Sequence, residues 1–234
     1  MKILTVISNF NESQSISETV TDVRNNSSVK TDILVIDNCS ADNSLELLKE
    51  LKVDYLVHPV NTGSSAGVIK TAFAYAYYHD YDLYCHMDGD NQHKASELVN
   101  LIRPILRNEA DVVTGSRFLN KEGFQSLFFR RQAIYFFSWL LSFVTGRRFT
   151  DITSGFRAFN KKAIEFFATR FGSEIDTIVQ LELAMFYSGI REIDVPVTMR
   201  PRITGKSEFN FRNMIKFPVY NLISLIGMII QKHY

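Results

Sequence analysis

The feature that most constrains this fold is a regular alternation of predicted strands and helices along the N-terminal half. Short apolar runs predict strands over residues 3–8, 32–37, 53–57, 83–88 and 111–115. Helical periodicity between them predicts helices over residues 15–24, 41–52, 65–78 and 95–108, and Ser40 is placed to cap the second helix. Strands separated by such helices form right-handed βαβ units, so we predict an α/β fold with a mainly parallel sheet and helices on both faces.

Polar side chains gather where the predicted strands end. They are Asn9, Asn11 and Glu12 after the first strand, Asp37 and Asn38 after the second, Asp88 and Asp90 after the fourth, and Ser116 and Arg117 after the fifth. Because ligands of parallel α/β sheets bind beyond the carboxyl ends of the strands, these groups predict a nucleotide site at one edge of the sheet.

The fourth strand leads directly into a group of oxygen-bearing side chains. Asp88, Asp90 and Gln92 alternate, so they point the same way if the backbone stays extended, and Gly89 allows a tight bend. Two carboxylates and an amide oxygen suit Mg²⁺ or Mn²⁺. The alternative for an isolated Asp-x-Asp is an ordinary turn that closes a strand.

Two common nucleotide-binding classes are excluded by missing motifs. No Gly-x-Gly-x-x-Gly follows the first strand and no Gly-Lys-Ser/Thr loop occurs, which argues against a dinucleotide oxidoreductase and a P-loop NTPase. The loop at residues 61–67 offers backbone N–H groups to an anion or only shapes a turn, and Lys70 beyond it reaches a phosphate or is solvated. The net charge of +1 gives no reason to expect a nucleic acid as partner.

The termini and cysteines indicate an intracellular protein. A strand that begins next to Lys2 leaves no room for a secretory signal, and Cys39 and Cys85 fit reduced thiols better than a disulfide. The 234 residues suffice for one α/β domain with a small appendage.

Two aromatic, apolar segments raise the question of a membrane. Residues 133–144 are flanked by four arginines, and residues 215–230 form a second mostly apolar stretch. A twelve-residue helix spans only about 18 Å, less than the bilayer core of about 30 Å. Each segment is either a core helix or a helix in a membrane interface, and together they favour peripheral attachment over a spanning helix.

Six motifs in order carry a resemblance to a known family. They occupy residues 5–12, 33–40, 87–93, 115–118, 151–159 and 202–207. The chain resembles family 2 glycosyltransferases of the GT-A fold, and most of all the dolichyl- or polyprenyl-phosphate mannose and glucose synthases. The resemblance covers residues 1–210, which we expect to form the GT-A domain, and leaves residues 211–234 as an apolar helical tail.

The resemblance implies roles for individual residues. It assigns Asn9, Asn11, Glu12 and Asp37 to the nucleotide, and Asp88, Asp90 and Gln92 to the metal and, through it, the donor diphosphate. Phosphate contacts fall to Arg117, Arg131, Arg202 and Ser207, because an Arg fork can hold a phosphate bidentately. Arg131 could equally extend to a membrane interface, whereas Arg157 is expected to pack or pair within the site wall. The donor implied is a UDP- or GDP-sugar.

The chain also departs from the family pattern. Ser8, Asn9 and Phe10 stand where Pro-Thr-Tyr is usual, Asn38 replaces a second acid, and Glu208 replaces a Lys. These changes leave the metal motif intact but affect the segments that meet the nucleotide and the acceptor.

Three functions are compatible with the sequence. The favoured one transfers a hexose, with inversion, to a polyprenyl phosphate at the cytoplasmic face of the membrane, with a membrane protein or a second copy as further partner. A second attacks with a sugar hydroxyl to extend a glycan, which needs a carboxylate base from among Glu174, Asp176 and Glu182. A third is a non-catalytic binding module that recruits a membrane partner.

Overall fold

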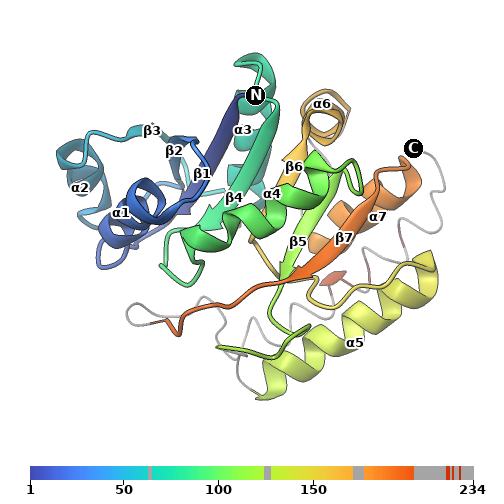
Figure 1. The fold of residues 1–234 in the computed structure, drawn as a ribbon. Coiled ribbons are helices and arrows are strands. Elements are labelled where there is room, and N and C mark those ends of the chain that lie inside the picture. The colour runs from blue at the N-terminus through green and yellow to red at the C-terminus, as the bar shows by residue number, and fades with distance from the viewer. Residues whose placement is uncertain are drawn as a thin grey trace.

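A seven-stranded sheet forms the centre of the molecule (Figure 1). The computed structural model describes residues 1–62, 65–123, 128–170 and 177–202, with positions 220, 221, 223 and 227. The strand order is β3-β2-β1-β4-β6-β5-β7. The strands are β1 (Ile3–Asn9), β2 (Asp32–Asp37), β3 (Asp54–Val57), β4 (Leu83–Asp88), β5 (Val112–Ser116), β6 (Arg157–Asn160) and β7 (Glu192–Pro196).

Only β6 runs against its neighbours in this sheet. It pairs antiparallel with β4 and with β5, whereas every other strand pair is parallel. The residues that precede β6 therefore reach the same edge as the residues that follow β4. The prediction of a mainly parallel sheet is confirmed.

Helices cover both faces of the sheet, as predicted. They are α1 (Ile16–Asn26), α2 (Ser44–Glu50), α3 (Ser65–Tyr78), the 3₁₀ turn η1 (Ala95–Glu97), α4 (Leu98–Leu106), α5 (Phe128–Thr145), α6 (Lys161–Thr169) and α7 (Ile178–Tyr187). Alternate residues of β1 enter different cores: Leu4 and Val6 pack with α3, α5, α6 and α7, while Ile3 and Ile7 pack with α1, α2 and α4. The period of two along a strand produces this division.

The structure corrects two details of the predicted helices. Ser40 does not cap α2, which begins at Ser44 with Asn43 before it. The Ser40 hydroxyl instead donates to Asp37 over 2.6 Å, because this short side chain folds back onto the end of β2. The helix predicted over residues 95–108 starts as the 3₁₀ turn η1 and ends at Leu106, with Pro104 in its last turn.

The helix α5, in yellow-green in Figure 1, has two unlike faces. Ile134, Phe137 and Leu141 are buried, whereas Phe136, Trp139 and Phe143 on the other face are 53%, 62% and 76% exposed. Within the described ranges, no helix combines the length and apolar character needed to cross a bilayer. Most of the predicted tail, residues 211–234, lies outside the described residues.

Candidate active site

The carboxyl end of β4 carries the two acidic residues of the predicted metal motif. Asp88 ends the strand with a side chain that is 42% exposed, and Asp90 follows in a tight turn with a side chain that is 10% exposed. Gly89 makes this turn possible: its N–H donates to the Ser8 carbonyl over 2.8 Å, and a Cβ would stand 2.9 Å from that oxygen. The close approach of β1 and β4 therefore requires a glycine between the two acids.

Two imidazoles and a glycine surround the carboxylate of Asp88. Nε2 of His86 lies 3.9 Å from Oδ1, and Nε2 of His93 lies 3.7 Å from Oδ2. Nδ1 of His93 accepts the N–H of Asp88 over 3.1 Å, so its proton sits on Nε2, which faces the carboxylate. Gly155, in the loop before β6, leaves room for both carboxylate oxygens. Neither histidine nor Gly155 was singled out from the sequence.

The charge of Asp90 is opposed by its surroundings. Burial, and then the neighbouring charge of Asp88, raise the pKa of Asp90 above its ordinary value. Nη1 of Arg202 lies 3.5 Å from Oδ2 of Asp90, and the same guanidinium pairs with Glu12, whose pKa burial also raises. Glu12, Asp90 and Arg202 thus meet at one edge, as the sequence predicts.

The donor atoms at this edge fit a hard divalent cation. No group of three His, Cys, Asp and Glu side chains in the described part of the chain is arranged to hold a metal. Mg²⁺ sites commonly use one or two carboxylates and complete the shell with water and phosphate. Two adjacent acids of which one has a raised pKa would lose their mutual repulsion when a cation binds between them. The residues present therefore fit the predicted metal.

Asp37 joins the loops that follow β1 and β2. Its carboxylate is fully buried and accepts from Nδ2 of Asn9 over 2.6 Å and from the N–H and hydroxyl of Ser40 over 2.9 and 2.6 Å. The Ser40 hydroxyl also accepts the N–H of Asn11 over 2.8 Å. Asp37 therefore holds these loops in shape, and its predicted contact with the nucleotide stays a prediction.

Arg117 is engaged by an acid. The predicted phosphate-binding guanidinium forms a two-pronged pair with Asp151, with distances of 2.6 and 2.7 Å, and its side chain is only 7% exposed. It also donates to the Thr153 hydroxyl over 2.9 Å. Arg117 thus fixes the loop before β6, and a direct phosphate contact remains a prediction.

Arg157 is buried as an ion pair, as predicted. Its guanidinium lies 2.6 Å from Glu182 and 3.5 Å from Glu192, and all three side chains are at most 4% exposed. Because Glu182 is committed to this pair, it is unsuited to act as a catalytic base. The other two candidate bases, Glu174 and Asp176, lie outside the described residues, as does Ser207.

Two of the remaining predicted residues lie on helices, and Gln92 lies in the turn after β4. Lys70 occupies the second turn of α3 and Arg131 the first turns of α5, and both are half-buried. Gln92 donates from Nε2 to the Arg200 carbonyl over 3.3 Å, and its predicted binding of the metal through the amide oxygen stays a prediction.

Comparisons with known proteins show a matching family and similar relatives. The family model described as Glycosyl transferase family 2 matches residues 5–168. The chain is similar to UDP-N-acetylglucosamine–dolichyl-phosphate N-acetylglucosaminyltransferase of Methanococcus voltae, with 28% identity over 70% of this chain and 71% of the relative. It is also similar to undecaprenyl-phosphate mannosyltransferase of Micrococcus luteus, with 26% identity over 90% of this chain and 88% of the relative.

A solved structure shares the fold. Glucosyl-3-phosphoglycerate synthase from Mycobacterium tuberculosis, in complex with Mn²⁺, UDP and phosphoglyceric acid, aligns with a TM-score of 0.68 and 15% identity. The alignment covers 97% of this chain and 78% of that chain. The predicted GT-A fold is confirmed.

Proposed function

The chain belongs to glycosyl transferase family 2, and from that premise we propose that it transfers a hexose from a UDP- or GDP-sugar to a polyprenyl phosphate. It is a glycosyltransferase, and the curated relatives named above act on dolichyl phosphate and undecaprenyl phosphate. The observation that carries the proposal is the meeting of Asp88, Asp90, Arg202 and Glu12 beyond the carboxyl ends of β1 and β4.

The donor diphosphate would bind between the acids and Arg202. A divalent ion, Mg²⁺ or Mn²⁺, held by oxygens of Asp88, Asp90 and Gln92 would neutralise charge on the departing diphosphate. Arg202 would leave Glu12 and bind a phosphate oxygen, because a diphosphate offers it a stronger charge. Glu12 would then be released to accept from the ribose. Attack of the acceptor in line with the departing diphosphate would invert the anomeric centre.

A phosphate acceptor suits this site better than a hydroxyl acceptor. A lipid phosphate is already an anion and needs no strong base, whereas a sugar hydroxyl must lose its proton to a carboxylate. Glu182 is held by Arg157 at 2.6 Å and is buried, which favours the phosphate. Extension of a glycan on a sugar hydroxyl remains the second candidate, with Glu174 or Asp176 as its base.

We also propose that the enzyme attaches to the cytoplasmic face of the membrane through the side of the molecule that carries α5. The exposed face of α5 bears Phe136, Trp139 and Phe143, and the exposed Arg148 follows the helix. Aromatic rings with a nearby cation are typical of a helix that lies in the headgroup region of an anionic membrane. Residues 1–210 would form the catalytic domain and residues 211–234 a second contact with the bilayer.

A donor and acceptor screen tests the proposal. Purified protein with Mn²⁺ is incubated with UDP-, GDP- or dTDP-sugars, with and without a short polyprenyl phosphate. We expect release of one nucleotide that the lipid phosphate stimulates. Release that ignores the lipid phosphate would instead favour the glycan acceptor.

The metal motif is tested by Asp90→Asn. We expect a loss of activity of about 100-fold or more, because the leaving group loses electrostatic stabilisation. The matched control is Asp80→Asn, since Asp80 lies on the surface with a side chain that is 83% exposed. Full activity of Asp90→Asn would falsify the proposed role of the motif.

A further inference from the structure

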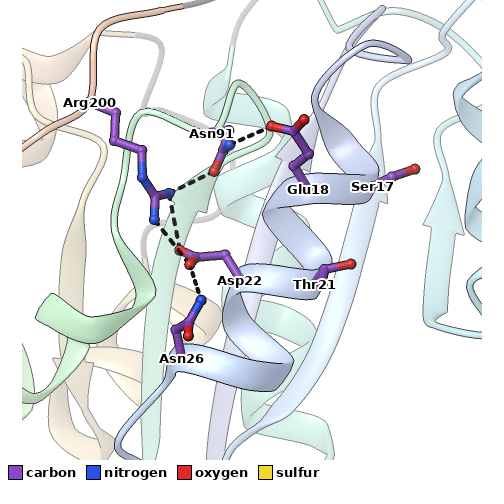
Figure 2. Close-up of a pocket in the computed structure, with 7 residues that line it drawn as sticks. All are labelled: Ser17, Glu18, Thr21, Asp22, Asn26, Asn91 and Arg200. Atoms are coloured by element: carbon purple, nitrogen blue, oxygen red, sulfur yellow. Dashed lines mark hydrogen bonds and ion pairs between the residues drawn. The ribbon is translucent and has the colours of Figure 1, made fainter.

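An arginine outside the proposed reaction centre joins three segments of the chain. Figure 2 shows Arg200, which follows β7, reaching Asp22 on α1 and Asn91 in the turn after β4. Its Nη2 lies 3.0 Å from Oδ1 of Asp22, its Nη1 lies 3.2 Å from Oδ2, and Nη1 donates to Oδ1 of Asn91 over 2.7 Å. We call Asp22 and Arg200 the clamp.

The acid of the clamp is firmly held. Its side chain is 8% exposed, and it also accepts the N–H of Ala95 over 2.8 Å and the side-chain amide of Asn26 over 2.8 Å. Burial opposes its charge, but the hydrogen bonds from Arg200, Ala95 and Asn26 outweigh burial and lower the pKa of Asp22. The clamp is therefore a hydrogen-bonded ion pair with a buried acid and an arginine that is 30% exposed.

The backbone of Arg200 reinforces the same connection. Its N–H donates to the Gln92 carbonyl over 2.8 Å, and its carbonyl accepts from Nε2 of Gln92 over 3.3 Å. The metal-motif turn and the segment after β7 are thus joined by side chain and backbone together. Glu18 adds to this by accepting from Asn91 over 2.9 Å.

The clamp lies close along the chain to a residue of the proposed site. Arg202 is two residues beyond Arg200, a reach of at most about 7 Å, and it pairs with Glu12 and Asp90. Displacing Arg200 would therefore disturb the backbone that carries Arg202. Misplacement by about 1 Å can cost about 100-fold in rate.

We propose that Asp22 and Arg200 are positioning residues. By anchoring the segment after β7 to α1 and to the turn at residues 90–92, they hold Arg202 in register for the donor diphosphate. The inference rests on the proposed function, in which Arg202 binds that diphosphate. Neither clamp residue touches the reacting atoms, so each acts through Arg202.

A double-mutant cycle with Arg202 tests the inference. Arg200→Gln and the milder Arg200→Lys, which keeps the charge but loses the two-pronged geometry, are made alone and with Arg202→Ala. The readouts are kcat and KM for the donor, and the affinity for UDP with Mn²⁺ by calorimetry. Calorimetry keeps the cycle measurable where turnover is lost.

We expect Arg200→Gln alone to lower kcat about 10-fold and UDP affinity several-fold, and Arg200→Lys alone to lower both by less. In the Arg202→Ala background the same change should alter either quantity less than about 2-fold, because the group that the clamp positions is gone. Arg191→Gln removes another ion-paired arginine, near Asp111, and should leave both readouts unchanged.

Two results would overturn the inference: equal losses in both backgrounds, or no loss from Arg200→Gln alone. A fully active Arg202→Ala enzyme would instead contradict the proposed role of Arg202. The two failures are therefore distinguishable. Urea unfolding of every variant separates a loss of fold from a loss of position.

Discussion

At the scale of single residues, the space around Asp88 is the most sensitive feature of the site. A Cβ added at Gly155 would stand 3.0 Å from Oδ2 and 3.1 Å from Oδ1 of Asp88. The carboxylate ends a side chain that is 42% exposed, so it can turn away while the backbone stays in place. The fold should therefore survive a substitution that displaces this proposed metal ligand.

We expect Gly155→Ala to weaken Mn²⁺ activation and transferase activity by about 10- to 100-fold. The measurement is activity as a function of Mn²⁺ concentration. Gly146→Ala is the matched control, because Gly146 has a φ of +69° and open space around its Cβ position. It should lower stability by about 1 kcal/mol but leave Mn²⁺ activation unchanged. An equal effect of both variants on Mn²⁺ activation would contradict the prediction that Gly155 is needed to leave room for the Asp88 carboxylate.

Residue roles could be predicted from the sequence only where a local motif carries them. Asp88 and Asp90 are two positions apart at the end of a strand, so the sequence shows them together. His93 follows in the same motif and could have been identified from it, although it was not singled out. Asp22 and Arg200 are 178 positions apart, so no local sequence pattern predicts that they pair. Asp37 and Arg117 were predicted to contact ligands because they lie at the ends of strands. Their contacts with other residues of the protein could not be predicted, because those residues are distant in the sequence or show no pairing motif.

At the scale of elements, the strands β6 and β7 bury more negative than positive charge. Arg157 faces Glu182 and Glu192, and Asp194 lies nearby on β7. Burial, followed by the charge of Glu182, raises the pKa of Glu192 well above its ordinary value. Burial and then the charge of Glu192 raise the pKa of Asp194 to about 6. These acids are more easily protonated in the folded chain than in the unfolded chain.

The free energy of unfolding should therefore depend on pH. A raised pKa contributes stability that is fully present below the unfolded-state pKa of about 4 and is lost as the pH rises through the folded-state pKa. We expect these two acids to contribute a fall on the order of 1–3 kcal/mol between about pH 4 and pH 7. His86, whose pKa burial lowers to about 4, contributes in the opposite direction over the same range. Urea titrations over this range would measure the net dependence.

Relative to the wild type, Asp194→Asn should lose a contribution that falls with rising pH, because it removes the group with a pKa of about 6. Its amide oxygen can still accept from Thr150, whose N–H and hydroxyl contact Asp194 over 2.6 and 2.5 Å. The exposed Asp80→Asn variant should keep the wild-type slope. An unchanged slope in Asp194→Asn would assign the pH dependence elsewhere.

Helices and strands could be predicted from the sequence where their apolar residues form a clear run or a regular repeat. The strand at residues 32–37, the helix at 65–78 and the strand at 83–88 were predicted with the bounds that the structure gives. β6 has only four residues and begins with a buried arginine, so it shows neither an apolar run nor an alternation. The apolar stretch at residues 133–144 fits a core or an interface, and α5 has one buried and one exposed face.

At the scale of the whole molecule, the exposed aromatic face of α5 predicts a side that binds membranes. We expect Trp139→Ala with Phe143→Ala to weaken partitioning onto anionic vesicles by about 10-fold or more, because both rings lose apolar burial in the bilayer interface. Vesicle co-sedimentation measures the effect. Activity on a short, water-soluble acceptor should change little.

The control for this prediction is Tyr78→Ala. Tyr78 ends α3 and is 82% exposed, so the Tyr78→Ala substitution removes a similarly accessible ring from another element. It should leave vesicle binding unchanged. If all variants bind vesicles equally well, α5 is not the membrane contact.

The central position of β6 has a consequence for how the molecule holds together. β4 and β5 do not pair with each other, so within the sheet the four residues of β6 form the hydrogen-bonded link between β3-β2-β1-β4 on one side and β5-β7 on the other. The two hydrophobic cores also span both sides. Proteins open locally in cooperative units that often follow such boundaries. The cooperativity of unfolding should therefore depend on β6 and on the two shared cores together. Release of β6 would end the backbone hydrogen bonding between the two sides and leave the core packing alone to hold them together.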